Sequence, residues 1–338
     1  MTENVRIERS SRTSRIFAAA GLLIFVLLVT APFYSGRSAL HLLVEIFSYL
    51  ALASLWNLLA GYSGLVSIGQ QAFVGLGGYS LFTLTMFAGV SPILAIFLAG
   101  LIAALFAMPT AWIIFRLKGA YFAIGTWVVA EVYRLTFAQV SILGGGSGSS
   151  LPTQVIQSIA PTRAIRDNLI YWTGLFLIVA VLATIYLILR SRWGLALAAI
   201  RDSEPAAESV GVDNYRAKFL VYLLTAGATG CVGALISLQE LRISPDAAFS
   251  VNDWTAFIIF IVVIGGIGRM EGPLLGTIIF FLLREFFADW GPWYLMLLGL
   301  FAIVMMLAIP KGIAGLLADR FDIQIFPLRR RVRLEEPK

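Results

Sequence analysis

Uninterrupted apolar stretches recur along the whole chain, and they constrain its fold more than any other feature. As a helix, a stretch of about 18 to 25 such residues crosses a hydrocarbon core of roughly 30 Å. Of 338 residues, 59% are hydrophobic and 13% are charged, whereas about 25% are charged in an ordinary soluble domain. An outer-membrane barrel would show shorter segments that alternate between apolar and polar residues. The sequence therefore predicts an all-α fold, a polytopic transmembrane helical bundle.

Hydropathy and helix-breaking residues together predict about ten spans. The spans are expected at 16–34, 39–59, 71–88, 92–115, 119–140, 169–189, 217–240, 252–268, 272–288 and 293–309. The first span follows basic residues, as a signal peptide does. Its apolar stretch is long for a signal sequence and no clear small-residue cleavage site follows, so we expect it to be retained.

The lysine and arginine residues indicate the orientation. With the N-terminus inside, ten crossings also return the C-terminus to the cytoplasm, and 19 of the 25 basic residues fall on the inner side. This distribution is the one that the positive-inside rule expects. The net charge of +6 therefore indicates topology and contact with anionic membrane lipid, and no nucleic-acid partner is expected. We expect a basic cytoplasmic tail at 1–15, one transmembrane domain at 16–317 and a second basic tail at 318–338.

Residues that carry catalysis or bind metals are scarce. Cys231 is the single cysteine and His41 the single histidine, so neither a disulfide framework nor a His/Cys metal site is expected. A membrane-embedded enzyme would need a convergent nucleophile, base or metal set, and a channel would need a ring-forming filter. Neither pattern stands out, and we assign no catalytic and no metal-binding residue.

The inner loop at about 190–216 contains helix signals. Asp202 or Ser203 can cap a short helix, Pro205 suits its first turn and Gly211 is placed to end it. Glu204 near the start is favourable for the helix dipole.

The same helix has two interpretations. Ala206 and Ala207 are small enough to let another surface approach closely. The helix is then either a docking element at the inner face or an ordinary solvated loop helix.

The outer loop at about 141–168 begins with a glycine-rich run, Gly144–Ser150. Glycine runs can cradle phosphate, but no Lys-Ser or Lys-Thr follows and no strand precedes this one. We expect a flexible external connector, with a contact surface for an external partner as the alternative.

Glycine clusters occur at 61–79 and at 265–276. Glycines at these spacings allow membrane helices to pack closely, or to break partway and line a pathway. Both interpretations remain open from the sequence.

Charged residues within the expected spans all lie in the outer half of the membrane: Glu45, Glu131, Arg134, Arg284 and Glu285. Such residues are costly in lipid and require a partner or a pathway. Glu131 and Arg134 are three residues apart and share a helix face. We hypothesise that they line an outer vestibule for a zwitterion, the alternative being a pair that only fixes packing. Arg284 and Glu285 lie near a helix end, where snorkelling is the simple explanation.

Several segments resemble a known family. Residues 57–79 resemble the glycine-rich segment of permeases in branched-chain amino-acid ABC importers, specifically the larger of the two Liv-type permeases. Segments 118–124, 204–211 and 265–276 are similar to further parts of that family, in the family's order. The resemblance covers about residues 40 to 317. Many relatives carry histidine where this chain has Gln70, so the role of that position is not transferred.

The resemblance implies a permease subunit in the bacterial inner membrane. Its expected partners are a second related permease, two cytoplasmic ATPase subunits that hold ATP–Mg, and a periplasmic solute-binding protein. Residues that match the ATPase-coupling helix of the family are Glu204, Ala206, Ala207, Glu208 and Gly211. Residues that we expect along the translocation path are Glu131, Arg134, Ser67, Gln70, Gly75 and Gly266.

The positions of the lysines agree with ATP binding by a partner subunit rather than by this chain. A phosphate-binding loop needs Gly-Lys-Ser or Gly-Lys-Thr, and no lysine here follows a glycine. Nucleotide is therefore expected on a partner, and this chain is expected to bind no cofactor and to be no enzyme. The remaining alternative is an ion-coupled secondary transporter, which usually carries midplane carboxylates. The solute stays open among branched-chain and other amino acids, urea or short amides, and small aromatic acids.

Overall fold

The computed structural model describes residues 5–8, 12–287, 290–291, 293–321 and 331–334. The long helices are α1 (Arg12–Thr30), α2 (Arg37–Asn57), α3 (Gln70–Met86), α4 (Pro92–Ile114), α5 (Ala120–Ala138), α7 (Arg163–Arg190), α10 (Asn214–Glu240), α13 (Gly272–Phe287) and α14 (Trp293–Ala308). The shorter helices are α6 (Thr153–Ile159), α8 (Arg192–Asp202), α9 (Glu204–Ser209), α11 (Pro245–Ala248), α12 (Phe257–Gly265) and α15 (Gly312–Phe321). Turns of π-helix, η2 (Leu58–Tyr62) and η5 (Asn252–Ala256), continue α2 and precede α12. The predicted all-α class is confirmed.

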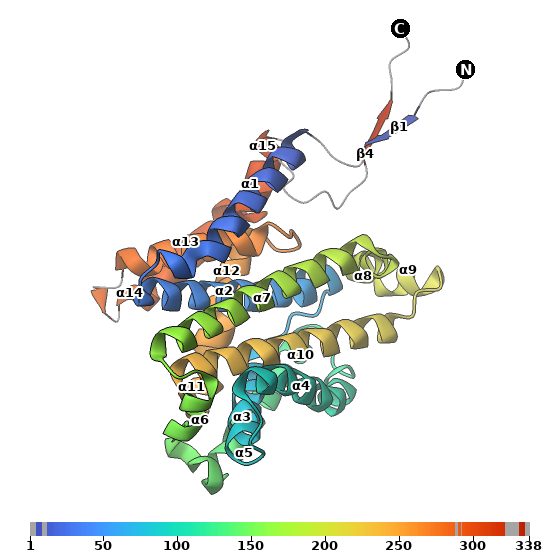
Figure 1. Ribbon diagram of the computed structural model, residues 1–338. Helices are drawn as coiled ribbons and strands as arrows, with labels where there is room; N and C mark the ends of the chain where they lie inside the picture. Colours follow the sequence, from blue (N-terminus) through green and yellow to red (C-terminus); the bar gives the residue numbers. More distant parts are fainter. Residues whose placement is uncertain (1–4, 9–11, 288–289, 292, 322–330, 335–338) are drawn as a thin grey trace.

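Four short strands form two antiparallel pairs among the described residues. Strand β1 (Val5–Glu8) pairs with β4 (Arg331–Leu334), so one short segment from near each end of the chain lies beside the other (Figure 1). Strand β2 (Ser149–Ser150) pairs with β3 (Arg242–Ile243). The second pair attaches the outer loop to the segment after α10. Because this loop also contains α6 and the 3-10 turns η3 (Ser141–Leu143) and η4 (Gly145–Ser147), it is more than the plain connector that its glycines suggested.

Helix α10 is the centre of the bundle. It packs against α3 and α4 on one side and against α2 and α7 on the other (Figure 1). Helix α2 in turn contacts α12 and α13, which carry the C-terminal part of the fold. The charged ends of α2, α10 and α13 are thereby brought to one region of the molecule.

Small side chains explain how closely α4 and α10 approach each other. Every fourth residue of α4 is an alanine that is fully buried: Ala95, Ala99, Ala103, Ala107 and Ala111. A Cβ placed on Gly100 would lie 2.2 Å from the Sγ atom of Cys231 on α10. Backbones of membrane helices that meet through small residues gain van der Waals contact that larger side chains would prevent.

The first glycine cluster contributes to the same packing. A Cβ on Gly77 of α3 would lie 2.0 Å from the carbonyl oxygen of Gly230, and one on Gly75 would lie 2.3 Å from the ring of Phe249. Close packing is therefore the interpretation that the structure supports for these glycines.

Six helical segments in the described part of the chain are long and apolar enough to cross a membrane. They are Arg37–Tyr62, Pro92–Ile114, Arg163–Arg190, Asn214–Glu240, Pro245–Gly265 and Leu295–Arg320. Each of the ten predicted spans overlaps a helix, but α1, α3, α5 and α13 are not among the six. The polytopic character is confirmed, whereas the number of ten and the cytoplasmic location of both ends stay predictions.

Candidate functional site

The inner loop contains two helices, α8 and α9, of which the sequence predicted only the second. The backbone N–H of Ala206 donates to the Oγ atom of Ser203 at 3.4 Å, so Ser203 rather than Asp202 caps α9. Pro205 lies in the first turn, and Gly211 follows the helix end with a φ of +87°. This left-handed conformation is one that glycine adopts without strain. The predicted limits of α9 are confirmed.

One face of α9 is held against the bundle. Lys218 on α10 donates a charge-assisted hydrogen bond to the carboxylate of Glu204, and the side-chain amide of Asn214 donates to the Glu204 carbonyl oxygen at 2.9 Å. Ala207 is only 2% exposed and packs into the core. The expectation that Ala207 lies on an approachable surface is therefore wrong, because its side chain is the apolar contact that seats the helix.

The opposite face of α9 is open. Ala206 and Glu208 are both exposed. The inner loop also carries exposed apolar side chains that the sequence did not single out: Trp193, Leu195, Val210 and Tyr215, of which Leu195 and Val210 are 75% and 77% exposed. The charged residues at both ends of this loop lower its average hydropathy, so the average hides these side chains.

The two glycine clusters meet each other close to this inner loop. The carbonyl oxygen of Gly61, in η2, accepts a hydrogen bond from Nη1 of Arg201 at the end of α8, at 3.0 Å. A Cβ on Gly61 would lie 2.5 Å from the backbone nitrogen of Gly268. Asn57 joins the same segments, because its amide donates to the Arg269 carbonyl and accepts from the Gly268 N–H, both at 2.8 Å.

The residues expected along the path lie inside the packing. Ser67 and Gln70 are both buried. The Oγ atom of Ser67 accepts from the N–H of Gly69 at 3.2 Å, and Gln70 donates through Nε2 to the Leu52 carbonyl at 3.0 Å. Within the described residues, the side-chain oxygen of Gln70 has no hydrogen-bond partner. Gly75 contacts Phe249, and Gly266 takes a φ of +121° between α12 and α13. Their role in a path stays a prediction.

Glu131 and Arg134 pair as predicted, and a third residue joins them. The Nε atom of Arg134 lies 3.0 Å from each carboxylate oxygen of Glu131, and Nη2 lies 2.6 Å from Oε1. Nη1 donates at 2.6 Å to Asp246, which α11 supplies from far along the sequence. The arginine is thus shared by two carboxylates. Their part in an outer vestibule is not tested by this geometry.

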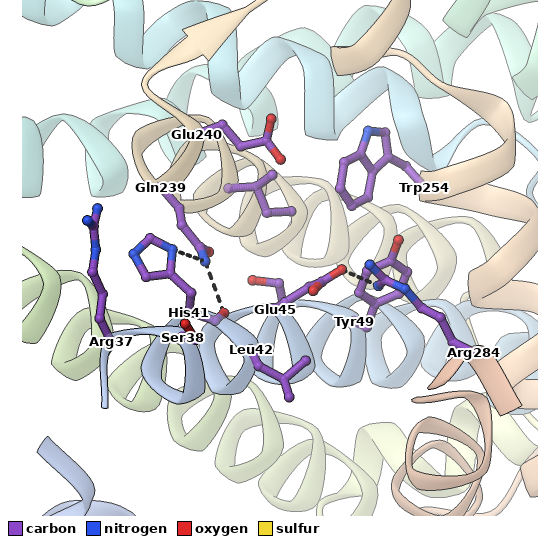
Figure 2. A pocket seen from close by; sticks show the side chains of 12 residues that line it. Arg37, Ser38, His41, Leu42, Glu45, Tyr49, Gln239, Glu240, Trp254 and Arg284 are labelled. Carbon is purple, nitrogen blue, oxygen red and sulfur yellow. Dashed lines mark hydrogen bonds and ion pairs between the residues drawn. The ribbon is translucent and has the colours of Figure 1, made fainter. Parts of the chain in front are cut away.

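A cavity of about 760 Å³ opens between α2, α10, η5 and α13 (Figure 2). Its walls carry both signs of charge and two aromatic rings: Arg37, His41, Glu45, Tyr49, Gln239, Glu240, Trp254 and Arg284. A second cavity of about 570 Å³ adjoins it and shares Glu45, Glu240 and Arg284. Sequence reasoning found Glu45 and Arg284 as charges within spans, but it missed Glu240 and Trp254.

Arg284 donates to the carboxylate of Glu45 (Figure 2). Snorkelling is therefore the wrong description of Arg284, because its guanidinium meets an opposite charge on α2. Glu285, the next residue, is exposed. The pair brings α2 and α13 together at the cavity.

Comparisons with known proteins agree with this architecture. The family model described as "Branched-chain amino acid transport system / permease component" matches residues 38–310. The chain is 27% identical over 329 residues to the high-affinity branched-chain amino acid transport system permease protein LivM of Escherichia coli K12, which covers 91% of this chain and 76% of that protein.

Two more distant relatives are also similar. A probable branched-chain amino acid transport permease protein LivM of Methanocaldococcus jannaschii is 26% identical, over 57% of this chain and 54% of that protein. The nucleoside ABC transporter permease protein NupC of Lactococcus lactis is 24% identical, over 68% of this chain and 76% of that protein. No solved structure matches this chain.

The family match covers most of the chain, including the glycine clusters, the inner loop and every lining residue of the 760 Å³ cavity except Arg37. The six apolar helices give these segments the length to cross a membrane. The chain therefore belongs to the permease family of branched-chain amino acid transport systems, as a multi-pass ABC-importer component of the cell inner membrane.

Proposed function

We propose that this permease forms the translocation path for branched-chain or related amino acids, delivered by a periplasmic binding protein. ATP–Mg is bound and hydrolysed by two cytoplasmic ATPase subunits, and a second related permease completes the membrane part. The proposal of branched-chain amino acids follows the LivM relatives. The nucleoside permease among the relatives means that family membership alone does not fix the solute.

The coupling role is supported by the contacts that hold α9 against the bundle. Ala207 and the Glu204–Lys218 pair fix its inner face, while Ala206 and Glu208 remain exposed. Val210, which follows α9 directly, is 77% exposed, and Leu195 in the same loop is 75% exposed. Exposed apolar surface with polar surroundings marks protein contacts. A rigidly seated helix with one open face is suited to transmit movement of a bound ATPase.

Hydrogen bonds connect the inner loop directly to segments of the helical bundle. Arg201 connects α8 to Gly61 in η2, and Asn57 connects η2 to the segment between α12 and α13. Displacement of α8 and α9 by a partner would thus pull on two breaks between membrane helices. These breaks are the places where irregular backbone permits a helix to tilt.

The test is to purify the complex through a tag on this chain, from cells that express its genomic neighbours. ATP hydrolysis is then measured with and without the candidate binding protein. Ala206→Trp places a large side chain on the open face of α9 and is expected to abolish co-purification of the ATPase. Ala88→Trp, at an exposed alanine after α3 on the predicted outer side, serves as the matched control.

Two results would overturn the proposal. One is a stable complex whose ATPase content is equal for Ala206→Trp and Ala88→Trp. The other is a purified chain without ATPase that still accumulates solute in ion-loaded liposomes, which would favour ion-coupled secondary transport.

A further inference from the structure

The cavity between α2, α10, η5 and α13 has the composition of a binding site for a small charged molecule. Its lining residues lie at the ends of α2, α10 and α13 that the predicted topology places outside. Its volume of about 760 Å³ falls in the range of about 300 to 1,000 Å³ that is typical of ligand pockets. It combines carboxylates, guanidinium groups and aromatic faces, whereas a lipid-filled gap would be apolar.

Most polar groups of the cavity already satisfy one another. Arg284 binds Glu45, Arg37 binds Asp167 at 2.8 Å, and Gln239 donates to the carbonyl oxygen of His41 at 3.0 Å. These contacts fix the shape of the wall, because each joins two different helices. A ligand therefore meets a preformed site rather than mobile side chains.

Glu240 differs from the other charged residues of this lining. Its side chain lines both cavities, yet it has no hydrogen-bond or ion-pair partner in the part of the chain that the structure describes. Two more carboxylates, Glu45 and Asp253, line the adjoining cavity with it. The Glu240 side chain is exposed to the open cavity, so a cationic ligand can reach it and donate a charge-assisted hydrogen bond to it.

Aromatic rings stand beside this carboxylate. Figure 2 shows Glu240 and Trp254 on the side of the cavity opposite α2, which contributes Tyr49. The ring centroids of Trp254 and Tyr49 are 5.8 Å apart, and the indole N–H of Trp254 donates to the Ala247 carbonyl at 2.7 Å, which orients the ring. An ammonium group is attracted to such ring faces, and an aliphatic side chain packs on them equally well.

A counter-charge for a carboxylate is present in the same space. Arg284 lines both cavities together with Glu240, so one small molecule can contact both residues. Guanidinium groups bind carboxylates through paired N–H donors. Acid, base and apolar surface are thus presented together, and this is the combination that a neutral zwitterion with an apolar side chain requires.

We infer that this cavity is an outer subsite for an amino acid, in which Glu240 binds the ammonium group, Arg284 the carboxylate, and Trp254 with Tyr49 the apolar side chain. The inference rests on the proposed function, because it assigns a place on the import route to that solute. It also differs in place from the vestibule hypothesis at Glu131 and Arg134, because those residues lie on α5 and line neither cavity.

A thiol-protection experiment tests the subsite on the whole complex in lipid nanodiscs. Ser38→Cys puts a thiol at the exposed start of α2, on the cavity wall, where the serine side chain makes no hydrogen bond within the described residues. Labelling by a charged thiol reagent is followed with and without saturating leucine. Leucine and isopentylamine are expected to slow labelling several-fold, and 4-methylpentanoate, which lacks the ammonium group, is expected to have little effect.

Variants at Glu240 decide the assignment. Glu240→Gln is expected to abolish leucine protection, Glu240→Asp to restore part of it, and Glu285→Gln, at an exposed carboxylate that lines neither cavity, to leave it intact. Protection that persists in Glu240→Gln would overturn the subsite. A Ser38→Cys complex with native Glu240 that transports leucine, but whose labelling leucine does not slow, would also overturn it. A wild-type complex that neither hydrolyses ATP nor transports leucine would instead contradict the proposed function. If only the subsite is wrong, leucine gives no protection but the binding protein still stimulates ATP hydrolysis.

Discussion

Arg201 at the end of α8 donates a hydrogen bond of 3.0 Å to the carbonyl oxygen of Gly61 in η2. The same guanidinium binds Asp202 through Nε and Nη2, at 3.1 and 3.0 Å. The carboxylate therefore holds the arginine in the orientation that reaches Gly61. One side chain thus ties the inner loop to the break after α2.

Replacing Arg201 is expected to uncouple transport from ATP hydrolysis. Hydrogen bonds to charged groups contribute about 1.5 to 3 kcal/mol, and Arg201→Gln removes the one that joins α8 to Gly61. We expect ATP hydrolysis near the wild-type rate and a several-fold lower ratio of solute transported to ATP hydrolysed, measured in proteoliposomes. Arg216→Gln is the control, because Arg216 is 80% exposed and its ion-pair partner among the described residues is Asp213 in the same loop. A ratio that is equal in the two variants would contradict the link.

The Glu204–Lys218 pair is expected to stabilise the packing of α9 against the bundle. Lys218 is largely buried but Glu204 is half exposed, so solvent screening limits the coupling to about 0.5 to 1 kcal/mol. A double-mutant cycle with Glu204→Gln and Lys218→Met measures it, with ATPase binding to the permease as the readout. Strictly additive losses would show that the two side chains act independently.

Gly77 is expected to tolerate no side chain. An alanine Cβ there would meet the Gly230 carbonyl at 2.0 Å, and a rigid helix backbone cannot yield as a side chain does. Overpacking of this kind typically costs about 1 to 3 kcal/mol, so Gly77→Ala should lower the thermal stability of the purified protein in detergent. Gly299→Ala on α14 is the matched control, since a Cβ there meets nothing within 4 Å. Equal melting temperatures for the two variants would refute the packing argument.

The vestibule hypothesis at Glu131 predicts a defect in uptake without a defect in assembly. Glu131→Gln removes the carboxylate that binds two nitrogens of Arg134. If the pair lines a route for a zwitterion, uptake falls several-fold while the amount of complex in the membrane stays normal. Asp246→Asn is the comparison, because it leaves the Glu131–Arg134 pair in place. Normal uptake in Glu131→Gln would show that the pair only fixes helix packing.

Local signals predicted the limits of α9 because each of them acts within one turn. Ser203 caps the helix, Pro205 begins it and Gly211 ends it through contacts with near neighbours. Helix α8 was missed because the segment is short and contains arginines, and it was therefore predicted to be a loop. The buried position of Ala207 was missed too, since it depends on how α9 is placed against α8 and α10.

The outer cavity shows the limit of sequence reasoning most clearly. Glu45 and Arg284 were recognised as costly charges, but Glu45 lies on α2 and Arg284 on α13, and nothing in the sequence pairs them. Glu240 stood at a helix end, where a solvated carboxylate is ordinary. Its importance follows from the absence of a partner among the described residues that surround it and from the presence of Trp254.

The sequence by itself determined the membrane class, the predominance of helix and the approximate positions of the long helices, because hydrophobic length and local capping are properties of contiguous residues. Only the tertiary structure decided that Gly61 meets Gly268, that Arg134 reaches Asp246, and that the ends of α2, α10 and α13 enclose a cavity. The physical reason is that each of these contacts joins segments remote in the chain. Their meeting is fixed by which helices pack around α10, a choice set by small residues such as Gly77, Gly100 and Gly230 on facing helices.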